Sequence, residues 1–297
     1  MRALITGGRG FVGTWLAEHL RSQGDEVAIV DLETDVADPA AIGPALRDIA
    51  PDVVYHLAGL THVGESWDAP NEVLRVNVLG TASVVAAARA SGCESVLVVS
   101  SAEVYGAVVA DQLPLTESSP VAPVSPYAAS KAAAEQVALQ AWRAHGQRVL
   151  IVRPFNHIGP GQAPTFAVSG LARRIVEARR EQAATLSVGT LTTRRDFTDV
   201  RDVARAYRLL VCNGEPGIIY QVCSGRDVAI SEIAARLLEL AGAELELVTD
   251  PSLVRPVDVP VLVGSPARLE SATGWKPELS LEDTLADVLA YWEQRAC

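Results

Sequence analysis

Tyr127 and Lys131 have residue types and a spacing suited to proton transfer on a substrate oxygen. On a helix, side chains four residues apart lie on one face, so the phenol and the ammonium can be neighbours. A free tyrosine has a pKa of about 10, and bringing it near 7 takes roughly 4 kcal/mol of differential stabilisation. An ammonium about 4 to 5 Å away supplies that order of energy at an effective dielectric constant of roughly 20. The alternative is an ordinary surface tyrosine on an alanine-rich helix.

A glycine-rich segment follows an expected buried strand at residues 2–6 and precedes an expected helix that extends to about residue 23. Gly7, Gly10 and Gly13 recur at three-residue spacing. In dinucleotide-binding loops, one such glycine makes the turn, one lets the backbone approach a pyrophosphate, and one lets the helix pack on the strand. The segment therefore predicts a dinucleotide site at the start of the chain.

The second expected strand, residues 27–30, ends at Asp31. A carboxylate there accepts hydrogen bonds from an adenosine ribose and repels a 2′-phosphate, so it favours NAD(H) over NADP(H). Arg9 lies inside the glycine turn and opposes this preference, because a guanidinium there could offset the acid and bind a phosphate. We expect NAD(H) or NADP(H), with a preference for NAD(H).

Strands and helices alternate along the first half of the chain. Strands are expected at 53–56, 95–99 and 149–152, helices at about 71–90 and from 127 onward, and a stub of strand at Asp35–Val36 beside the adenine. Such alternation predicts a Rossmann-type α/β fold, a doubly wound parallel sheet that binds ligands beyond the carboxyl ends of its strands. Asp31, Gly59 and Ser101 each follow a strand and are expected at that edge.

After Pro154 the pattern changes to shorter elements separated by proline and glycine. Such punctuation is typical of turns between short elements. We therefore expect an NAD(P)-binding domain over 1–153 with part of 194–225, and a smaller α/β substrate-binding lobe made mainly of 154–297.

The composition restricts the class of protein. The formal net charge is −11, which argues against binding to nucleic acid or to an anionic membrane. The four cysteines show no metal-ligand spacing, and no apolar run approaches the roughly 18 residues of a membrane span. With the first strand starting at residue 2, a signal peptide is not expected either. The sequence predicts a cytoplasmic enzyme without a metal site.

Five motifs in order carry a family resemblance. They are TGGRGFVG at 6–13, HLAG at 56–59, NVLGT at 77–81, SSAEVYG at 100–106 and YAASK at 127–131. Together they resemble the extended short-chain dehydrogenase/reductase family of nucleotide-sugar epimerases, dehydratases and reductases. The segments RPFNHIGPGQ at 153–162 and RRDFTDVRDVARAY at 194–207 resemble the 4-ketoreductases of GDP-linked 4-keto-6-deoxyhexoses.

The resemblance implies a role for each motif residue. Ser101 hydrogen-bonds the reacting sugar oxygen, Tyr127 gives that oxygen a proton, and Lys131 holds the tyrosine and the nicotinamide ribose. The residues expected to bind the cofactor are Gly7, Arg9, Gly10, Phe11, Val12, Gly13, Asp31, Asp35, Val36, Leu57, Ala58, Gly59, Asn77, Ser100, Tyr127, Lys131 and Phe155.

The residues after Ser101 help to choose the reaction. Similar dehydratases place an acidic or hydroxyl side chain where this chain has Ala102, and losing a proton donor there costs roughly 10²- to 10⁴-fold in rate. Dehydration is therefore disfavoured. Glu103 either polarises the substrate or caps a local turn. A 4-epimerase remains an alternative, because AGLTHVGES at 58–66 also resembles the epimerases, and a cofactor-sensing protein without turnover is a third possibility.

For the substrate, the resemblance places Asn156, Arg195 and Arg255 on the nucleotide diphosphate. Thr61 and His62 follow the loop at 57–59 and either touch the sugar or, for His62, cap the loop. Val188 marks a region where the base could bind. The helices at 71–90 and 127–145 resemble those that pair in family homodimers, although their alanine-rich faces could equally pack on the sheet. We expect a homodimer.

Overall fold

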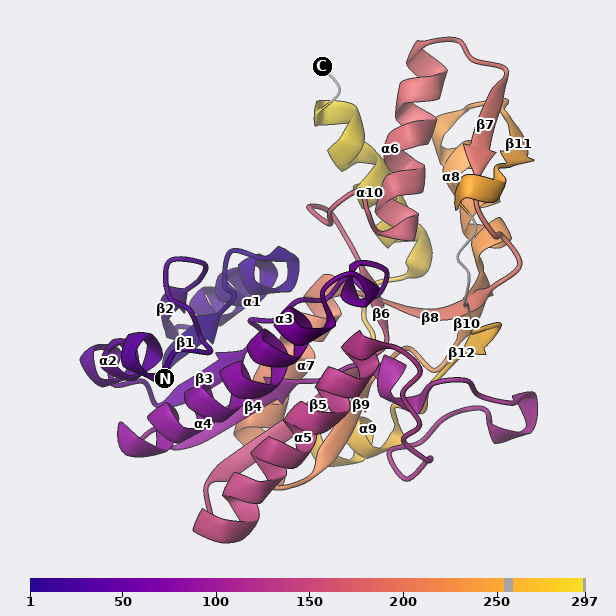
Figure 1. Cartoon of the computed structure of the whole chain (residues 1–297). Helices are drawn as coiled ribbons and strands as arrows, with labels where there is room; N and C mark the ends of the chain where they lie inside the picture. The colour runs from indigo at the N-terminus through magenta and orange to yellow at the C-terminus, as the bar shows by residue number, and fades with distance from the viewer. Residues whose placement is uncertain (254–258, 296–297) are drawn as a thin grey trace.

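Residues 1–253 and 259–295 are described by a computed structural model, in which a larger lobe holds a six-stranded sheet and a smaller lobe lies beyond the ends of its strands (Figure 1). All six strands are parallel. Their order across the sheet is β2 (Glu26–Val30), β1 (Arg2–Thr6), β3 (Val53–His56), β4 (Ser95–Val99), β5 (Arg148–Pro154) and β9 (Ile219–Val222). From β1 the chain first adds β2 on one side and then β3 on the other, so the direction in which strands are added reverses between β1 and β3. Such sheets bind ligands at this point. The predicted doubly wound α/β fold is confirmed.

Helices cover both faces of this sheet. The helices on one face are α2 (Pro39–Ile49), α4 (Gly80–Ala90) and α5 (Pro126–His145), and those on the other are α1 (Phe11–Ser22), α7 (Val200–Asn213) and α9 (Ala267–Thr273). Because the side chains of a strand alternate between faces, Leu4 joins the core under α2 and α4 while Ile5 joins the core under α1 and α7. Burial on both faces explains why these strands are continuously apolar.

The predicted helix at 71–90 consists of three segments. They are α3 (Pro70–Leu74), a π-helical turn labelled η2 (Arg75–Leu79) and α4. By length and composition alone, Pro70–Ala90 could cross a membrane, which corrects the expectation that no stretch approaches that length. However, α4 packs against α2 and α5 and supplies Val84 and Val85 to the core, so this apolar stretch forms part of the helical layer.

The predicted strand stub at Asp35–Val36 is wrong. These residues form a turn between β2 and α2, in which the Asp35 carboxylate accepts the Ala37 N–H at 2.9 Å. Val36 is buried, and its Cγ2 lies 2.9 Å from where a Cβ at Gly80 would be. The turn therefore packs on the start of α4 instead of extending the sheet.

The smaller lobe has its own core. Its strands are β6 (Asn156–Ile158), β8 (Arg194–Asp199), β10 (Asp227–Ala229) and β12 (Val261–Leu262), with β7 (Thr185–Val188) paired to β11 (Glu246–Thr249). Its helices are α6 (Ala167–Arg180), α8 (Ile230–Ala241) and α10 (Leu281–Arg295), which pack around Ile175, Ile233 and Leu285. Short helical turns occur at η1 (Glu65–Trp67), η3 (Ala102–Tyr105), η4 (Ala110–Gln112) and η5 (Pro251–Leu253).

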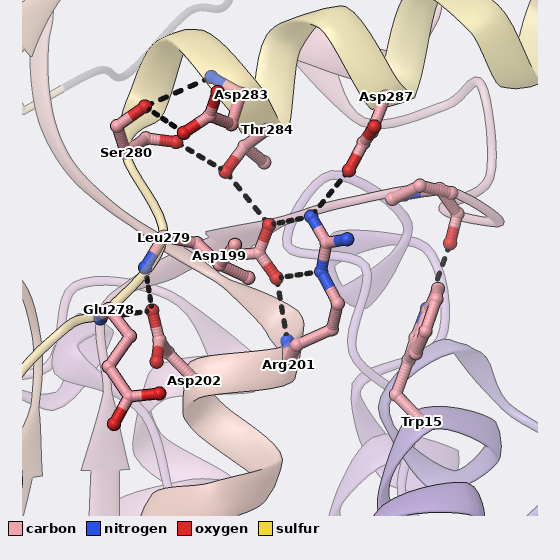
Figure 2. A network of polar contacts seen from close by, with 11 residues as sticks. Trp15, Asp199, Arg201, Asp202, Glu278, Leu279, Ser280, Asp283, Thr284 and Asp287 are labelled. Atoms are coloured by element: carbon pink, nitrogen blue, oxygen red, sulfur yellow. Dashed lines mark hydrogen bonds and ion pairs between the residues drawn. The ribbon is translucent and has the colours of Figure 1, made fainter.

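Polar contacts at the start of α7 join the two lobes (Figure 2). The buried Asp199 carboxylate accepts the backbone N–H of Arg201 at 2.8 Å, the Arg201 guanidinium at 2.7 and 2.8 Å, and the Thr284 hydroxyl of α10 at 2.8 Å. Arg201 also pairs with Asp287 of α10 at 2.7 Å and lies over the Trp15 ring of α1. Elements of both lobes thus meet at one ion-pair cluster, which fixes the lobes on either side of the cleft between them.

Candidate active site

A cleft of about 1170 Å³ extends from the glycine loop of the larger lobe into the smaller lobe. A typical small-molecule site has a volume of about 300 to 1,000 Å³, so this cleft is larger than most sites for one small ligand. The predicted site residues that line it are Gly7, Gly10, Phe11, Val12, Gly13, Asp31, Asp35, Val36, Leu57, Ala58, Gly59, Thr61, His62, Ser100, Ser101, Glu103, Tyr127, Lys131, Phe155, Asn156, Val188 and Arg195. Among the described residues, Arg9 and Asn77 do not line it, and Arg255 lies outside the described residues.

The glycine loop forms a surface that only glycine permits. Gly7 has a φ of +70°, and a Cβ there would lie 2.9 Å from the backbone of Ala58, at the end of β3. A Cβ on Gly13 would lie 2.4 Å from the Gly7 carbonyl oxygen. Helix α1 starts without a side-chain cap at Gly10, so its first N–H groups are available to an anion. These features fit the pyrophosphate of a dinucleotide.

Asp31 and Arg9 form part of the loop structure at the adenosine end. The Asp31 carboxylate accepts the backbone N–H of Arg9 at 2.7 Å and that of Leu32 at 2.9 Å. The Arg9 guanidinium pairs with Glu33 at 2.7 and 3.1 Å. Asp31 is therefore fixed where a ribose can reach it, while the charge of Arg9 is paired with a second acid.

The predicted catalytic residues meet at the end of β4. Ser125 caps helix α5 by accepting the Ala128 N–H at 3.1 Å, and Pro126 occupies its first turn, so the helix begins immediately before Tyr127. A hydrogen bond joins Tyr127 to Ser101, and Ser101 also accepts the Glu103 N–H at 3.1 Å. The phenol of Tyr127 and the hydroxyl of Ser101 therefore lie side by side in the cleft.

Burial and two neighbouring side chains influence the pKa of Tyr127. Burial raises the pKa of Tyr127 to about 12, the hydrogen bond from Ser101 opposes this rise, and the charge of Glu103 adds to it. Tyr127 is consequently protonated at neutral pH. The Lys131 Nζ donates to the Val99 carbonyl at 2.9 Å, and its effect on the pKa of Tyr127 stays a prediction.

Lys131 lies in a confined position between the ends of β3 and β4. It is 5% exposed, and burial lowers its pKa to about 8 while the charge of Glu135 acts in the opposite direction. A Cβ on Gly59 would lie 3.3 Å from its Nζ and 2.8 Å from the Asn77 Oδ1. Glycine at 59 is therefore part of the site, because it leaves space for the lysine.

Two residues that were predicted to bind the cofactor, Ser100 and Asn77, form side-chain hydrogen bonds with other groups of the protein. Ser100 donates its hydroxyl to Glu135 at 2.5 Å. Asn77, in the π-helical turn, donates to the Leu60 carbonyl at 3.0 Å and to the Ser130 hydroxyl at 2.8 Å, and accepts the Leu60 N–H at 2.8 Å. Asn77 thus fixes the loop after β3 against α5, which sets the wall of the cleft.

A buried hydrogen-bond chain behind the glycine loop fixes the same wall. Thr81 donates to the Asn77 carbonyl at 2.7 Å, so its oxygen accepts from His56 Nε2 at 3.1 Å. His56 Nδ1 then accepts from the Thr6 hydroxyl at 2.8 Å. Burial lowers the pKa of His56 to about 3, which keeps the imidazole neutral. His56 is a structural link between β1, β3 and α4.

The substrate side of the cleft is formed by the smaller lobe and the loop after β3. His62 accepts the Glu65 N–H at 3.2 Å, so it caps the short helix η1, and its ring meets Phe166 edge-on at 6.3 Å. Arg195 is 9% exposed and donates to the Arg194 carbonyl at 2.9 Å. Asn156 is exposed at the cleft, as the family resemblance requires for a residue that contacts the diphosphate.

Sequence reasoning missed two further arginines in this region. Arg173 and Arg174 of α6 line the cleft, and Arg174 is held by the Gly170 and Ser187 carbonyls at 3.2 and 2.6 Å. Burial, together with the charge of Arg173, lowers the pKa of Arg174. Such crowding of positive charge favours an anionic ligand. The sequence shows these residues only as one polar stripe of an amphipathic helix.

The switch-point sheet, the glycine loop and the Ser101–Tyr127–Lys131 group define a dehydrogenase of the short-chain type, dependent on a nicotinamide dinucleotide. Residues 3–223 match the NAD dependent epimerase/dehydratase family, and the chain belongs to that family. The chain is therefore an NAD(P)-dependent enzyme of the extended short-chain dehydrogenase/reductase type.

Similar proteins include reductases and epimerases. The chain is 41% identical over 298 residues to GDP-6-deoxy-D-mannose reductase of Pseudomonas aeruginosa, covering 99% of this chain and 98% of that protein. It is 28% identical over 326 residues to UDP-glucose 4-epimerase of Azospirillum brasilense, covering 99% and 92%. The structure of RMD from Pseudomonas aeruginosa complexed with NADPH matches with a TM-score of 0.92 at 40% identity, covering 99% of this chain and 100% of that one.

Proposed function

We propose that the protein reduces the 4-keto group of a nucleotide-activated 4-keto-6-deoxyhexose with NAD(P)H, converting GDP-4-keto-6-deoxy-D-mannose into GDP-D-rhamnose. The observation that carries this proposal is the 41% identity to a GDP-6-deoxy-D-mannose reductase over almost the whole length of both chains. The UDP-glucose 4-epimerase of Azospirillum brasilense is similar at 28%.

The Tyr127 phenol can supply the proton that a reduction requires. A ketone that receives a hydride must also receive a proton on its oxygen, whereas an epimerase or dehydratase begins by removing a proton from a sugar hydroxyl. With its pKa raised to about 12, Tyr127 is a proton donor at neutral pH. Ala102 also provides no second proton donor for the loss of water.

Each group of site residues has its own role in the proposed reaction. When bound, the reduced nicotinamide supplies the hydride. The loop at Gly7–Gly13 would hold the pyrophosphate, and Lys131 would bind the nicotinamide ribose. Ser101 would orient the sugar oxygen, and Tyr127 would transfer its proton to that oxygen.

The diphosphate of the sugar nucleotide would lie against the smaller lobe. Arg173, Arg174 and Arg195 line this part of the cleft in a protein whose net charge is −11. Guanidinium groups bind phosphate oxygens through two parallel hydrogen bonds, which suits a pyrophosphate. Asn156 would add a neutral donor.

The test of this proposal is the absorbance of reduced cofactor at 340 nm. With GDP-4-keto-6-deoxy-D-mannose, we expect one NAD(P)H to be consumed for each product molecule. The dTDP- and UDP-linked 4-keto-6-deoxy sugars serve as matched substrates that differ in the base. Product formed without net loss of reduced cofactor would instead support an epimerase, and preferential use of a dTDP- or UDP-linked sugar would refute the GDP assignment.

We infer that Asp31 restrains the use of NADPH. Its carboxylate is fixed at the end of β2, where the neighbouring acids Glu33 and Asp35 are each paired with an arginine. Asp31→Ser is expected to raise the ratio of kcat/KM for NADPH to that for NADH by about tenfold, because removing a like charge from a phosphate contributes roughly 1.4 kcal/mol. Glu33→Gln keeps Asp31 and releases the Arg9 guanidinium from its ion pair. It therefore separates the effect of the Asp31 charge from the effect of a free Arg9. An unchanged ratio in Asp31→Ser would contradict the inference.

We also propose a homodimer formed through α4 and α5. These helices lie side by side on the outside of the sheet (Figure 1). Leu74 at the end of α3 and Leu79 at the end of η2, just before α4, are 42% and 55% exposed. Light scattering on a size-exclusion column is expected to give twice the chain mass of 31.4 kDa. Leu79→Glu is expected to give a monomer. A wild-type mass of one chain would refute the dimer.

We propose a cytoplasmic location. Cys93, Cys212 and Cys223 are free thiols, as expected in a reducing compartment. Fractionation of the source cells, with immunodetection of the untagged chain, is expected to recover it with the cytosolic proteins. Recovery with membranes or in the medium would contradict this.

A further inference from the structure

Three consecutive residues at the end of β4 hold three residues of α5 that lie one helical turn apart. The Val99 carbonyl accepts from Lys131 at 2.9 Å, the Ser100 hydroxyl donates to Glu135 at 2.5 Å, and Ser101 bonds Tyr127. The spacing of four and eight residues from Tyr127 places all three side chains on one face of the helix. In Figure 1, α5 lies in front of β4 and β5. Tyr127, Lys131 and Glu135 therefore form one row along α5, and Glu135 lies one helical turn beyond Lys131.

Glu135 carries a charge in the interior of the protein. Its carboxylate pairs with Arg153 of β5 through two hydrogen bonds of 2.8 and 2.7 Å, and the two side chains are only 2% and 3% exposed. Arg153 also donates to the Tyr105 hydroxyl at 3.0 Å, which in turn accepts from Gln221 at 2.6 Å. A buried ion pair of this kind is costly to desolvate and is often replaceable by apolar residues without loss of stability. Stability alone therefore gives no reason for a carboxylate at this position.

The charges around Lys131 supply a reason. Glu135 lies one turn further along the same helix and is the acid that favours its ammonium form, against a strong effect of burial. The other titratable groups facing this region are His56 of β3, which is kept neutral, Tyr127, Glu103 of η3, and Arg153, whose charge is paired with Glu135. At one helical turn and a protein-like effective dielectric constant, an acid shifts the pKa of an ammonium by about one unit or more.

We propose that Glu135 is a positioning residue whose buried carboxylate, one helical turn from Lys131 on the same face of α5, favours the ammonium that donates to the Val99 carbonyl, and that it thereby sets the alkaline limit of cofactor binding. The inference rests on the proposed role of Lys131 in holding the nicotinamide ribose. It does not depend on the identity of the sugar. Arg153 holds the Glu135 carboxylate in place through two hydrogen bonds, so the two residues act together.

The test measures the affinity for NADPH and for NADH by fluorescence between pH 6.5 and 10, without any sugar substrate. The protonated lysine binds better, so affinity is expected to be high at low pH and to fall through an alkaline midpoint. In Glu135→Gln, the midpoint is expected to move down by about one pH unit. If the wild-type midpoint lies near pH 8, that shift corresponds to a loss of about fivefold in affinity at pH 8.

Companion variants separate the charge from the fold. Glu135→Gln leaves Arg153 buried without a carboxylate and can lower stability, so the double variant Glu135→Met/Arg153→Met, which removes both charges, is measured beside it. Its midpoint is expected to move in the same direction. Tyr105→Phe removes the hydroxyl that accepts from Arg153 but retains the charge of Glu135, so its midpoint is expected to stay at the wild-type value.

Lys131→Met identifies the group that titrates. The alkaline fall in affinity is expected to disappear in this variant, and adding Glu135→Gln to it is expected to cause no further change with pH. A wild-type midpoint in a folded Glu135→Gln or Glu135→Met/Arg153→Met protein would overturn the proposal, as would a shift that persists in the Lys131→Met background. Failure to turn over GDP-4-keto-6-deoxy-D-mannose would refute the proposed function and leave this measurement intact.

Discussion

Tyr127→Phe is expected to lower kcat for ketone reduction by roughly 10²- to 10⁴-fold while changing the affinity for NAD(P)H by less than about twofold. The phenol is the proton donor that faces the cleft beside Ser101, and its pKa is raised to about 12 by burial. Phenylalanine retains the ring and its packing, so only the hydroxyl group is lost. Stopped-flow absorbance at 340 nm with saturating substrate measures the chemical step.

Tyr55→Phe is the matched control for that substitution. Tyr55 lies in β3 and is fully buried, and its hydroxyl has no hydrogen-bond partner among the residues that the structure describes, so the same atom is removed away from the cleft. Removing an unsatisfied buried hydroxyl is neutral or stabilising. We expect wild-type kcat in Tyr55→Phe. A Tyr127→Phe enzyme with kcat equal to that of Tyr55→Phe would refute the assignment of Tyr127 as the acid.

Gly13→Ala is expected to lower the affinity for NADPH and for NADH by at least about a hundredfold, or roughly 2.7 kcal/mol. The new Cβ would lie 2.4 Å from the Gly7 carbonyl oxygen and 2.6 Å from the Gly8 Cα. Both neighbours are backbone atoms, so α1 has to move away from the loop, and its N–H groups leave the pyrophosphate site. Isothermal titration calorimetry with each cofactor measures the loss.

Gly43→Ala provides the comparison for this substitution. Gly43 is buried in the helix α2, and its added Cβ would meet only the end of the flexible Arg47 side chain at 3.4 Å. Replacing a helical glycine by alanine typically stabilises the helix by up to about 1 kcal/mol. Wild-type affinity is expected in Gly43→Ala. Wild-type affinity in Gly13→Ala as well would mean that the loop does not bind the pyrophosphate.

The parts of the site that depend on local pattern could be predicted from the sequence. The glycine loop follows from three glycines between a strand and a helix, and the positions of Ser101 and Tyr127 follow from a strand end and a helix start. Such features need only the periodicity of neighbouring residues and the rule that ligands bind at the carboxyl edge of a parallel sheet.

The parts that depend on contacts between distant residues could not be predicted. The Lys131 ammonium donates to a backbone carbonyl of β4, and carbonyls carry no signal in the sequence. Glu135 of α5 pairs with Arg153 of β5, which lies 18 positions further along the chain. The only signal for Glu135 was its place one helical turn after Lys131.

Two further differences have physical causes in packing. The segment Asp35–Val36 was expected to form a strand, but it forms a turn, because the Val36 side chain packs against Gly80 at the start of α4. Asn77 was expected on the cofactor, but its amide satisfies both backbone groups of Leu60. In each case, the side chain fits a neighbour that is more than 15 positions away.

The most direct test of the account is hydride transfer from NAD(P)H that carries deuterium at the transferable position of the nicotinamide. With GDP-4-keto-6-deoxy-D-mannose, we expect the product to contain one deuterium at C4 of the sugar for each cofactor oxidised, as read by mass spectrometry and NMR. A product without deuterium, formed while the reduced cofactor remains unconsumed, would contradict the account.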